Sequence, residues 1–280
     1  MGSYLTPTGC PVELTWTSGS GKVNATVELT GRHTTAANRL SHTVSRLRSI
    51  GVSLDQGELD AYQSMQQDQD LKYGCWLGLK HNRPQPSFKL YIEVPVARRS
   101  MALESIPTEW RPESPEVPAI LDMIGLNVSD GQKEFYFSAG SLLPRHLPII
   151  MKPVGLADRW QSLIGAIEAL WGWPAFRKLP GTRHGFSYSR RATGSVFSLF
   201  LFAEDLFADD ARLGKAVVRL GNQQGWQTDL YERLTKPLTS AAQGQMAHGI
   251  CAISIMEAGD PVYSFGFPPP PTKINRKKGD

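Results

Sequence analysis

Several short segments of the chain alternate between apolar and polar residues, as strands with one buried face do. In Phe88–Val94, one face carries Phe88, Leu90, Ile92 and Val94, and the other carries Lys89, Tyr91 and Glu93. Three further segments alternate in the same way: Val12–Thr17, Val23–Thr30 and Lys133–Ser138. The pattern therefore predicts strands that turn an apolar face to the core and a polar face away from it.

These strands belong to a repeat of predicted secondary structure rather than of amino-acid sequence. In this repeat, two strand-like stretches accompany one helix-like stretch roughly every 50 to 65 residues. The predicted strand pairs are Val12–Thr17 with Val23–Thr30, Leu71–Leu79 with Phe88–Val94, Lys133–Ser138 with Leu147–Met151, Gly185–Arg190 with Val196–Ala203, and Ile250–Met256 with Val262–Phe267. The predicted helices are Thr35–Ile50, Val117–Ile124, Ala157–Trp171, a helix capped by Asp209 or Asp210 that runs to about Leu220, and Asp229–Met246 with an interruption at Pro237.

Five hairpins with intervening helices fit either a closed barrel or an open sheet. Helices need the apolar sheet faces, so the polar faces point away from them, into a chamber if the sheet closes and into bulk water if it does not. Trp76, Tyr91 and Tyr136 lie on this polar face and favour a chamber, because aromatic side chains rarely cluster on a sheet face that is exposed to solvent. We therefore predict an α+β fold, a ten-stranded antiparallel β-barrel of five ββα-type repeats with helices outside. Residues 1–267 form one domain, and residues 268–280 form a Pro-rich and then basic disordered tail.

Composition narrows the class of protein. Apolar residues make up 41% and charged residues 20% of the 280 residues, as in an ordinary globular protein. No apolar run reaches the roughly 18 residues that span a bilayer, and the first residues do not read as a secretion signal. The net charge of +4 lies mostly in the tail after residue 272, which argues against nucleic-acid binding. Three widely spaced cysteines fit neither a disulfide framework nor a metal site, so we expect a cytoplasmic protein.

A resemblance to a known family follows from these repeats and from local motifs. Five ββα units around a polar interior resemble the ABBA-type (PT-barrel) aromatic prenyltransferases. The stretch Gly9–Trp16 is similar to the first hairpin of their indole branch, the dimethylallyl-tryptophan synthase type, and Phe88–Tyr91 is similar to the family's Lys-x-Tyr strand. The layout from Ser105 to Phe137 is similar to the small bacterial branch. The resemblance implies transfer of an allylic group from a prenyl diphosphate to an indole-like or phenolic acceptor, free or within a peptide.

The resemblance also implies roles for residues of the inner face. Glu13 is the expected catalytic residue, which orients the acceptor and accepts its proton. Trp76 is the expected wall of the acceptor site, together with Glu13. The expected diphosphate-binding residues are Lys89, Tyr91, Tyr136, Tyr188, Tyr263 and Asn24. The three tyrosines of the later units would shield the allylic cation from water.

Departures from the family pattern keep other functions open. Asn24 stands where the indole branch has an arginine, and Glu134 stands within Gln132–Tyr136 where that branch has Arg-x-Lys-x-Tyr. Lys152, Arg190 or Arg191 could compensate, and Mg²⁺ held by Glu134 or Glu93 could bridge to a diphosphate, although no cofactor is certain. The alternatives are an isomerase or cyclase of the same barrel that uses Glu13 as its acid–base group, or a non-catalytic barrel that binds an aromatic ligand.

Overall fold

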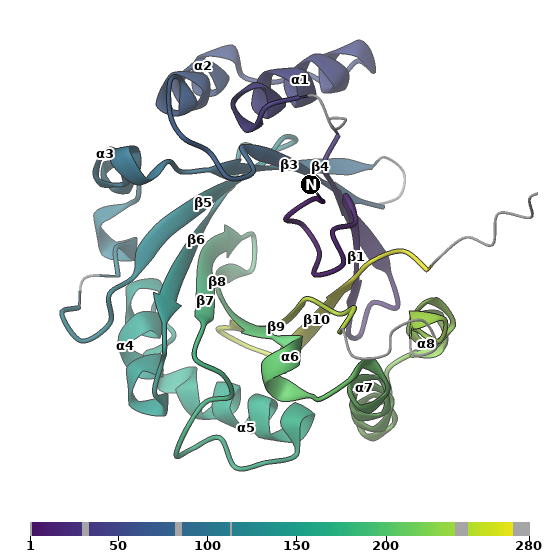
Figure 1. Cartoon of the computed structure of the whole chain (residues 1–280). Helices are drawn as coiled ribbons and strands as arrows, with labels where there is room; N and C mark the ends of the chain where they lie inside the picture. The colour runs from purple at the N-terminus through teal and green to yellow at the C-terminus, as the bar shows by residue number, and fades with distance from the viewer. Residues whose placement is uncertain (1, 30–33, 82–85, 113, 239–245, 271–280) are drawn as a thin grey trace, which may run out of the picture.

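Ten antiparallel strands close into a single barrel in the computed structural model, which describes residues 2–29, 34–81, 86–112, 114–238 and 246–270 (Figure 1). Each strand pairs with its neighbours in the sequence, and β1 closes the ring by pairing with β10. The strands are β1 Val12–Thr17, β2 Val23–Val27, β3 Cys75–Lys80, β4 Ser87–Glu93, β5 Ile120–Asn127, β6 Lys133–Gly140, β7 His184–Arg191, β8 Gly194–Phe202, β9 Ile250–Met256 and β10 Val262–Phe267. The closed barrel predicted from the strand pattern is thus confirmed.

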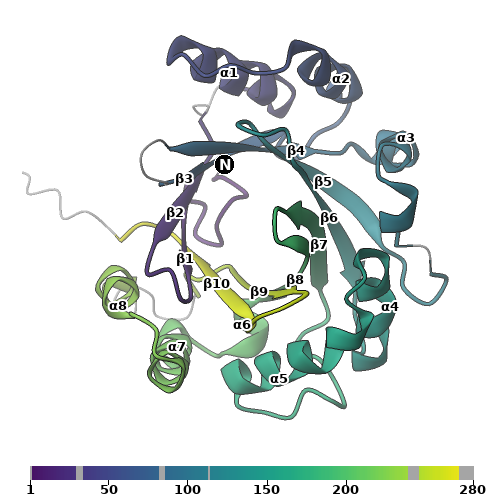
Figure 2. The ribbon, with the colours of Figure 1, turned by 180° about the vertical axis from the view of Figure 1, so that it is seen from behind.

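Helices surround the barrel on its outside, as the views from the front and from behind both show (Figures 1 and 2). They are α1 Ala36–Ser49, α2 Gln56–Gln66, α3 Arg99–Glu104, α4 Leu147–Met151, α5 Trp160–Trp171, α6 Ala203–Leu206, α7 Asp210–Gln224 and α8 Asp229–Thr235. Short 3₁₀ turns cover Val96–Arg98, Thr108–Trp110, Pro144–His146, Lys152–Val154 and Ala157–Arg159. None of the helices in the described part of the chain is both long and apolar enough to cross a bilayer.

The apolar core lies between the barrel wall and these helices. Leu90 and Ile92 on β4 are fully buried on the outer face, and Lys89 and Tyr91, which alternate with them, point inward. Phe186, Tyr188 and Phe197 form an aromatic cluster on the same outer face. Because successive side chains of a strand alternate between faces, packing the helices outside leaves the polar face for the lumen.

One predicted helix, Val117–Ile124, is wrong, because this stretch leads into and forms most of strand β5. A bulge between Leu121 and Met123 shifts the register against β6. The extra residue separates the buried Leu121 from Ile124 by three positions instead of two, which imitates helical spacing. The strand β5, and not Leu147–Met151, is therefore the partner of β6.

Leu147–Met151 is helix α4, so its predicted strand is also wrong. Leu147, Ile150 and Met151 are buried together at helical spacing, and Pro148 lies in the first turn, where a helix tolerates it. Helix α2, which is capped by Asp55, was not predicted, because its polar residues outnumber its apolar residues. The predicted helix Asp229–Met246 ends as α8 at Thr235, and its later part includes residues 239–245, which lie outside the described residues, as do Thr30 and residues 271–280.

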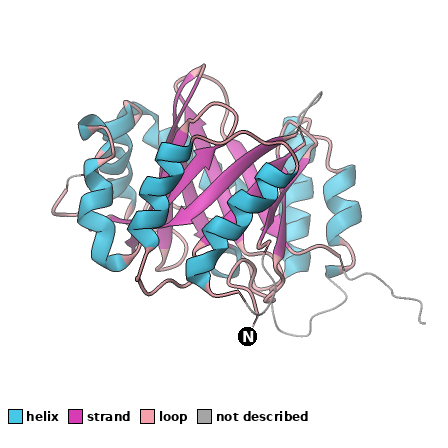
Figure 3. Ribbon diagram, turned by 90° about the horizontal axis from the view of Figure 1, so that it is seen from above, coloured by secondary structure: helices cyan, strands magenta, loops and turns pink. Residues whose placement is uncertain are grey.

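The N-terminal segment covers one end of the barrel. Residues 2–9, together with Gly249 and Ile250, line a depression of about 630 Å³ at this end. The segment is fastened by Ser3, which donates to Glu28, and by Thr6, which bonds both the N–H and the C=O of Cys10. The view across the barrel places the N-terminus beyond one end of the strands (Figure 3). We call this the N-terminal end of the lumen, and the end with Asn24 and Arg191 the opposite end.

Candidate active site

The lumen contains a cavity of about 290 Å³ lined by both aromatic and polar side chains. All ten strands contribute to it, and Leu5 of the N-terminal segment also lines it. The lining residues are Leu5, Glu13, Thr15, Thr26, Trp76, Tyr91, Met123, Glu134, Tyr136, Arg191, Ser198, Phe200, Ile250, Ala252, Ser254, Ser264 and Gly266. A concave, largely apolar cavity with a few convergent polar groups is the usual form of a small-molecule site.

Glu13 lies at the N-terminal end of this cavity. A Cβ on Gly266 would come within 2.8 Å of its carboxyl carbon, so the missing side chain of Gly266 is what makes room for it. Among the described residues, Glu13 has neither a hydrogen-bond partner nor a salt bridge. Burial away from bulk water raises its pKa from 4.5 to about 8. The carboxyl group is thus free to meet a ligand and titrates close to neutral pH.

Trp76 lines the same cavity as Glu13 and stacks on Tyr73, with ring centroids 4.2 Å apart. Its indole Nε1 is buried and has no hydrogen-bond partner within the described part of the chain. The glycines on either side of Trp76, Gly74 and Gly78, do not leave space for a ligand. A Cβ on Gly78 would meet the ring of Tyr91 at 2.8 Å, and one on Gly74 would meet the carbonyl oxygen of Ala36 at 2.0 Å.

A buried ion pair joins the middle strands of the lumen. Lys89 on β4 forms a salt bridge with Glu134 on β6 and donates to the Tyr136 hydroxyl at 2.9 Å, while Ser187 on β7 donates to Glu134. A Cβ on Gly125 would lie 2.4 Å from Cε of Lys89. The Lys89 side chain therefore passes over β5 at the position of this glycine.

The partners hold each other in the charged state. Burial alone would lower the pKa of Lys89 and raise that of Glu134, but their mutual attraction outweighs it and reverses both directions. Lys89 is only 5% exposed. Glu134 lines the cavity, whereas Lys89 does not.

Three aromatic rings form a wall next to this pair. The rings of Tyr91 and Tyr136 are tilted with centroids 5.8 Å apart, and Tyr136 stacks on Phe200 at 5.7 Å. The Lys89 ammonium lies 5.1 Å and 5.2 Å from the centroids of the two tyrosine rings. Such faces stabilise a neighbouring cation and exclude water from it.

Two further cations, Lys80 and Arg191, lie at the opposite end of the lumen. Lys80 was not predicted as a site residue, and Arg191 was predicted only as a residue that could compensate for missing cations. Arg191 lines the cavity, and Lys80 lies on the same strand face as Trp76 and Gly78. Desolvation lowers the pKa of Lys80, and the positive charges of Lys89 and Arg191 lower it further. The other two candidates lie elsewhere, because Arg190 packs over Trp110 and Lys152 belongs to a turn outside the barrel.

Besides Lys89, three other predicted diphosphate-binding residues are not among the described residues that line the cavity. Tyr188 faces outward and donates its hydroxyl to the carbonyl of Ile150, and Tyr263 faces outward and donates to Ala166. Asn24 lies opposite Thr15 on the inner face of β2, but it is not among the described residues that line the cavity. The lumen thus brings together Glu13, Trp76, Lys89, Tyr91 and Tyr136 from the predicted set.

The carboxylates considered for Mg²⁺ are already engaged. Glu93 accepts the backbone N–H groups of Lys72, Tyr73 and Gly74 at 2.9, 2.7 and 2.6 Å, and so fixes the turn before β3. Glu134 is paired with Lys89. No group of three or more histidine, cysteine or acidic side chains in the described part of the chain could hold a metal ion. These donors do not fit a magnesium site.

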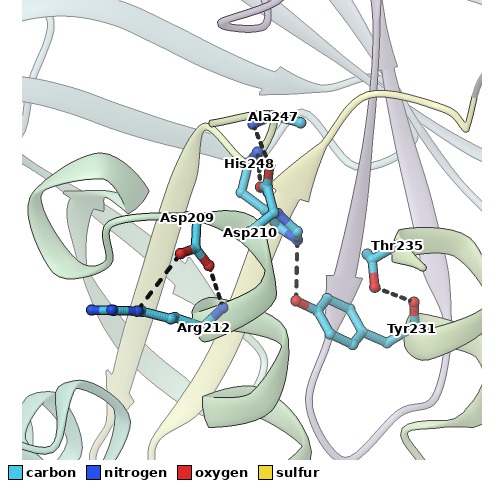
Figure 4. A network of polar contacts seen from close by, with 7 residues as sticks. All are labelled: Asp209, Asp210, Arg212, Tyr231, Thr235, Ala247 and His248. Carbon is cyan, nitrogen blue, oxygen red and sulfur yellow. Dashed lines mark hydrogen bonds and ion pairs between the residues drawn. The ribbon is translucent and has the colours of Figure 1, made fainter. Parts of the chain in front are cut away.

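A second polar cluster lies outside the lumen, between α7, α8 and the segment before β9 (Figure 4). Asp210 accepts from the backbone N–H groups of Ala247 and His248 and bonds the His248 ring at 2.6 Å, and the other ring nitrogen meets the Tyr231 hydroxyl at 3.1 Å. Burial alone would raise the pKa of Asp210, but these hydrogen bonds hold it below its ordinary value. Because Tyr231 and His248 are almost completely buried, the cluster fixes the path into β9.

Known structures with the same barrel decide the fold. The 6-dimethylallyltryptophan synthase from Micromonospora olivasterospora, in complex with DMASPP and Trp, superimposes with a TM-score of 0.74 and 17% identity over 96% of this chain and 86% of that one. The prenyltransferase PriB, in a binary complex with product diphosphate, gives 0.73 and 12% over 97% and 85%. The 5-dimethylallyltryptophan synthase from Streptomyces coelicolor, with DMASPP and Trp, gives 0.71 and 14% over 98% and 85%. The chain has the prenyltransferase-barrel fold.

The resemblance drawn from the strand pattern is therefore confirmed for the architecture. No protein-family model matches the chain, and no curated protein is significantly similar in sequence. At identities of 12–17%, the likeness to prenyltransferase barrels establishes the fold alone. What this barrel does has to be argued from its own lumen.

Proposed function

We propose that the protein is an aromatic prenyltransferase, which transfers an allylic group from a phosphorylated prenyl donor to an indole-like or phenolic acceptor inside the barrel. The observation that carries the proposal is the polarity of the lumen. Glu13, a carboxyl group without a partner among the described residues, lies toward one end. The cations Lys80, Lys89 and Arg191 lie toward the other, with Tyr91, Tyr136 and Phe200 between. The three prenyltransferases named above bind diphosphates or donor analogues, which supports the same use of this lumen.

The cationic end suits the leaving group. When the allylic C–O bond breaks, both electrons leave with the phosphate oxygen, and positive groups stabilise that developing charge. Arg191 and Lys80 supply positive charge from β7 and β3, and the hydroxyl of Tyr136 lies beside Lys89. The carbocation left behind would face the rings of Tyr91 and Tyr136, which stabilise it and keep water away.

The carboxyl end suits the acceptor. A ring N–H or phenolic O–H can donate to Glu13 while the ring packs against Trp76. A donated hydrogen bond stabilises the carboxylate form, so acceptor binding itself would lower the raised pKa of Glu13. A ring carbon then bonds to the allylic carbon, and the proton lost from the ring passes to the carboxylate. A general base whose pKa lies near the operating pH is the most effective kind.

One observation keeps a second function in view. Because Lys89 is already neutralised by Glu134, the lumen also fits an acid–base enzyme of the same barrel, an isomerase or cyclase, in which Glu13 moves a proton without any phosphorylated donor.

A transfer assay separates the two. The protein is incubated with labelled dimethylallyl and geranyl phosphates and diphosphates against a panel of indoles, phenols and Trp or Tyr peptides, and products are detected by mass spectrometry. We expect a product heavier than the acceptor by one prenyl group, which Glu13→Gln reduces at least 100-fold and Thr17→Val, also on β1, leaves nearly unchanged. Absence of any prenylated product, with no rise in melting temperature on adding the donors, contradicts the proposal.

A further inference from the structure

Glu134 lies between the buried lysine of the lumen and the space that a donor would occupy. Its carboxylate lines the cavity, while Lys89 behind it is 5% exposed and does not. One carboxylate oxygen accepts from Lys89 and the other from Ser187 on β7, so the group is held from two strands. An anion that approaches Lys89 from the cavity therefore meets Glu134 first.

The charges around this point limit the anion that fits. Lys80, Lys89 and Arg191 interact electrostatically with one another, and Lys80 and Lys89 also interact with Glu134, which gives three positive charges against one negative charge. Asp130, in the turn between β5 and β6, adds negative charge on the side of Lys80. The net charge is at most +2. Lys80 and Arg191 are exposed, but Lys89 is buried and Glu134 is half-buried, and an excess of anionic charge beside such groups is costly unless it is paired.

We propose that Glu134 is a specificity-determining residue that selects a phosphate monoester, rather than a diphosphate ester, as the anionic end of the donor. This rests on the proposed function and names the substrate class of its donor site. A phosphate monoester carries about −1.5 to −2 at pH 7 and matches the available charge. A diphosphate ester adds about one further negative charge, which in this lumen faces the carboxylate of Glu134.

The chemistry balances with either leaving group. The allylic C–O bond breaks, both electrons stay on the phosphate oxygen, and inorganic phosphate replaces pyrophosphate as the second product. The acceptor ring supplies the electron pair of the new C–C bond and loses one proton to Glu13. Glu134 takes no part in bond making, so its effect is confined to which donor binds.

The test measures binding separately from turnover. Isothermal titration with dimethylallyl phosphate and dimethylallyl diphosphate is carried out on the wild-type protein, on Glu134→Gln, and on Asp122→Asn as the matched control. Asp122 also forms a salt bridge, with Arg99, but it is not among the described residues that line the cavity. Melting temperatures with and without each ester accompany the titrations.

We expect the wild-type protein and Asp122→Asn to bind the monophosphate at least tenfold more tightly than the diphosphate. Glu134→Gln reverses this order and binds the diphosphate at least tenfold more tightly than the wild type does. The wild-type comparison needs no variant, so it decides the matter even if Glu134→Gln fails to fold.

Tighter binding of the diphosphate than of the monophosphate by the wild type overturns the inference, whatever Glu134→Gln binds, while leaving the proposed function intact. Absence of binding of either ester to any of the three proteins overturns both.

Discussion

The carboxyl group of Glu13 on β1 lies against Gly266 on β10, at the seam where the first and last strands close the barrel. A Cβ at Gly266 would come within 2.8 Å of both the carboxyl carbon and Oε2. The glycine has no positive φ, so close approach rather than backbone conformation requires it. The closure of the sheet thus creates the space in which the proposed catalytic group lies.

Replacing Gly266 by alanine should therefore displace Glu13. We expect prenyl transfer by Gly266→Ala to fall at least tenfold, since misplacing a catalytic group by about 1 Å can cost up to 100-fold. Product formation is measured at saturating donor. Gly214→Ala on α7 is the control, because a Cβ there meets nothing within 4 Å. Equal activity of the two variants would show that the position of Glu13 is unimportant.

Glu13 should also make stability depend on pH in an unusual direction. Its pKa is raised in the folded state, so the unfolded chain ionises first and the folded state loses stability as pH rises from about 4.5 to about 8. Glu13→Gln should match the wild type at pH 4 and be more stable by about 1–3 kcal/mol at pH 9, a value discounted because the group borders a cavity. Denaturant unfolding at both pH values measures this. A constant difference between the proteins would contradict the raised pKa.

The tyrosines of the barrel should fall into two groups. Tyr188→Phe and Tyr263→Phe each lose a hydrogen bond to a helix carbonyl outside the lumen, so we expect a loss of about 1 kcal/mol in stability and no change in transfer. Tyr136→Phe removes a hydroxyl next to Lys89 and should raise KM for the donor at least threefold. Steady-state kinetics of the three variants decide, and a loss of activity in Tyr188→Phe equal to that in Tyr136→Phe would contradict the assignment of faces.

The same alternation rule explains what the sequence could and could not predict. It placed Tyr91 and Glu13 inward correctly, and applied throughout it also puts Tyr188 with Phe186, and Tyr263 with Phe265 and Phe267, on the apolar outer face. Those two tyrosines were therefore assigned to the lumen against a signal that the sequence contains.

Other features leave no comparable trace in the sequence. The bulge in β5 breaks the two-residue period at Leu121, which turned a strand into a predicted helix. The pairing of Lys89 with Glu134 depends on the neighbourhood of β4, β5 and β6, and on the missing side chain of Gly125 between them. Positions 45 residues apart in the chain come into contact only once the register is fixed.

The polar cluster outside the lumen should matter for stability rather than catalysis. Asp210→Asn weakens the bonds from His248 and Ala247 at a buried carboxylate, and we expect it to cost about 2–4 kcal/mol. Asp209→Asn is the matched control, because asparagine caps a helix about as well as aspartate. Thermal unfolding at pH 7 compares them. Equal melting temperatures would mean that the cluster does not anchor the segment before β9.

The central claim is that the lumen binds a phosphorylated prenyl donor with its anionic end toward Lys89 and Arg191. The most direct measurement is a crystal structure of the protein with a dimethylallyl thiolophosphate or thiolodiphosphate, which resist cleavage of the allylic bond. The account predicts phosphate oxygens within hydrogen-bonding distance of Arg191, and the prenyl chain between Tyr91, Tyr136 and Phe200, pointing toward Glu13. A lumen left empty by both analogues, or an anion bound only on the outer surface, would contradict it.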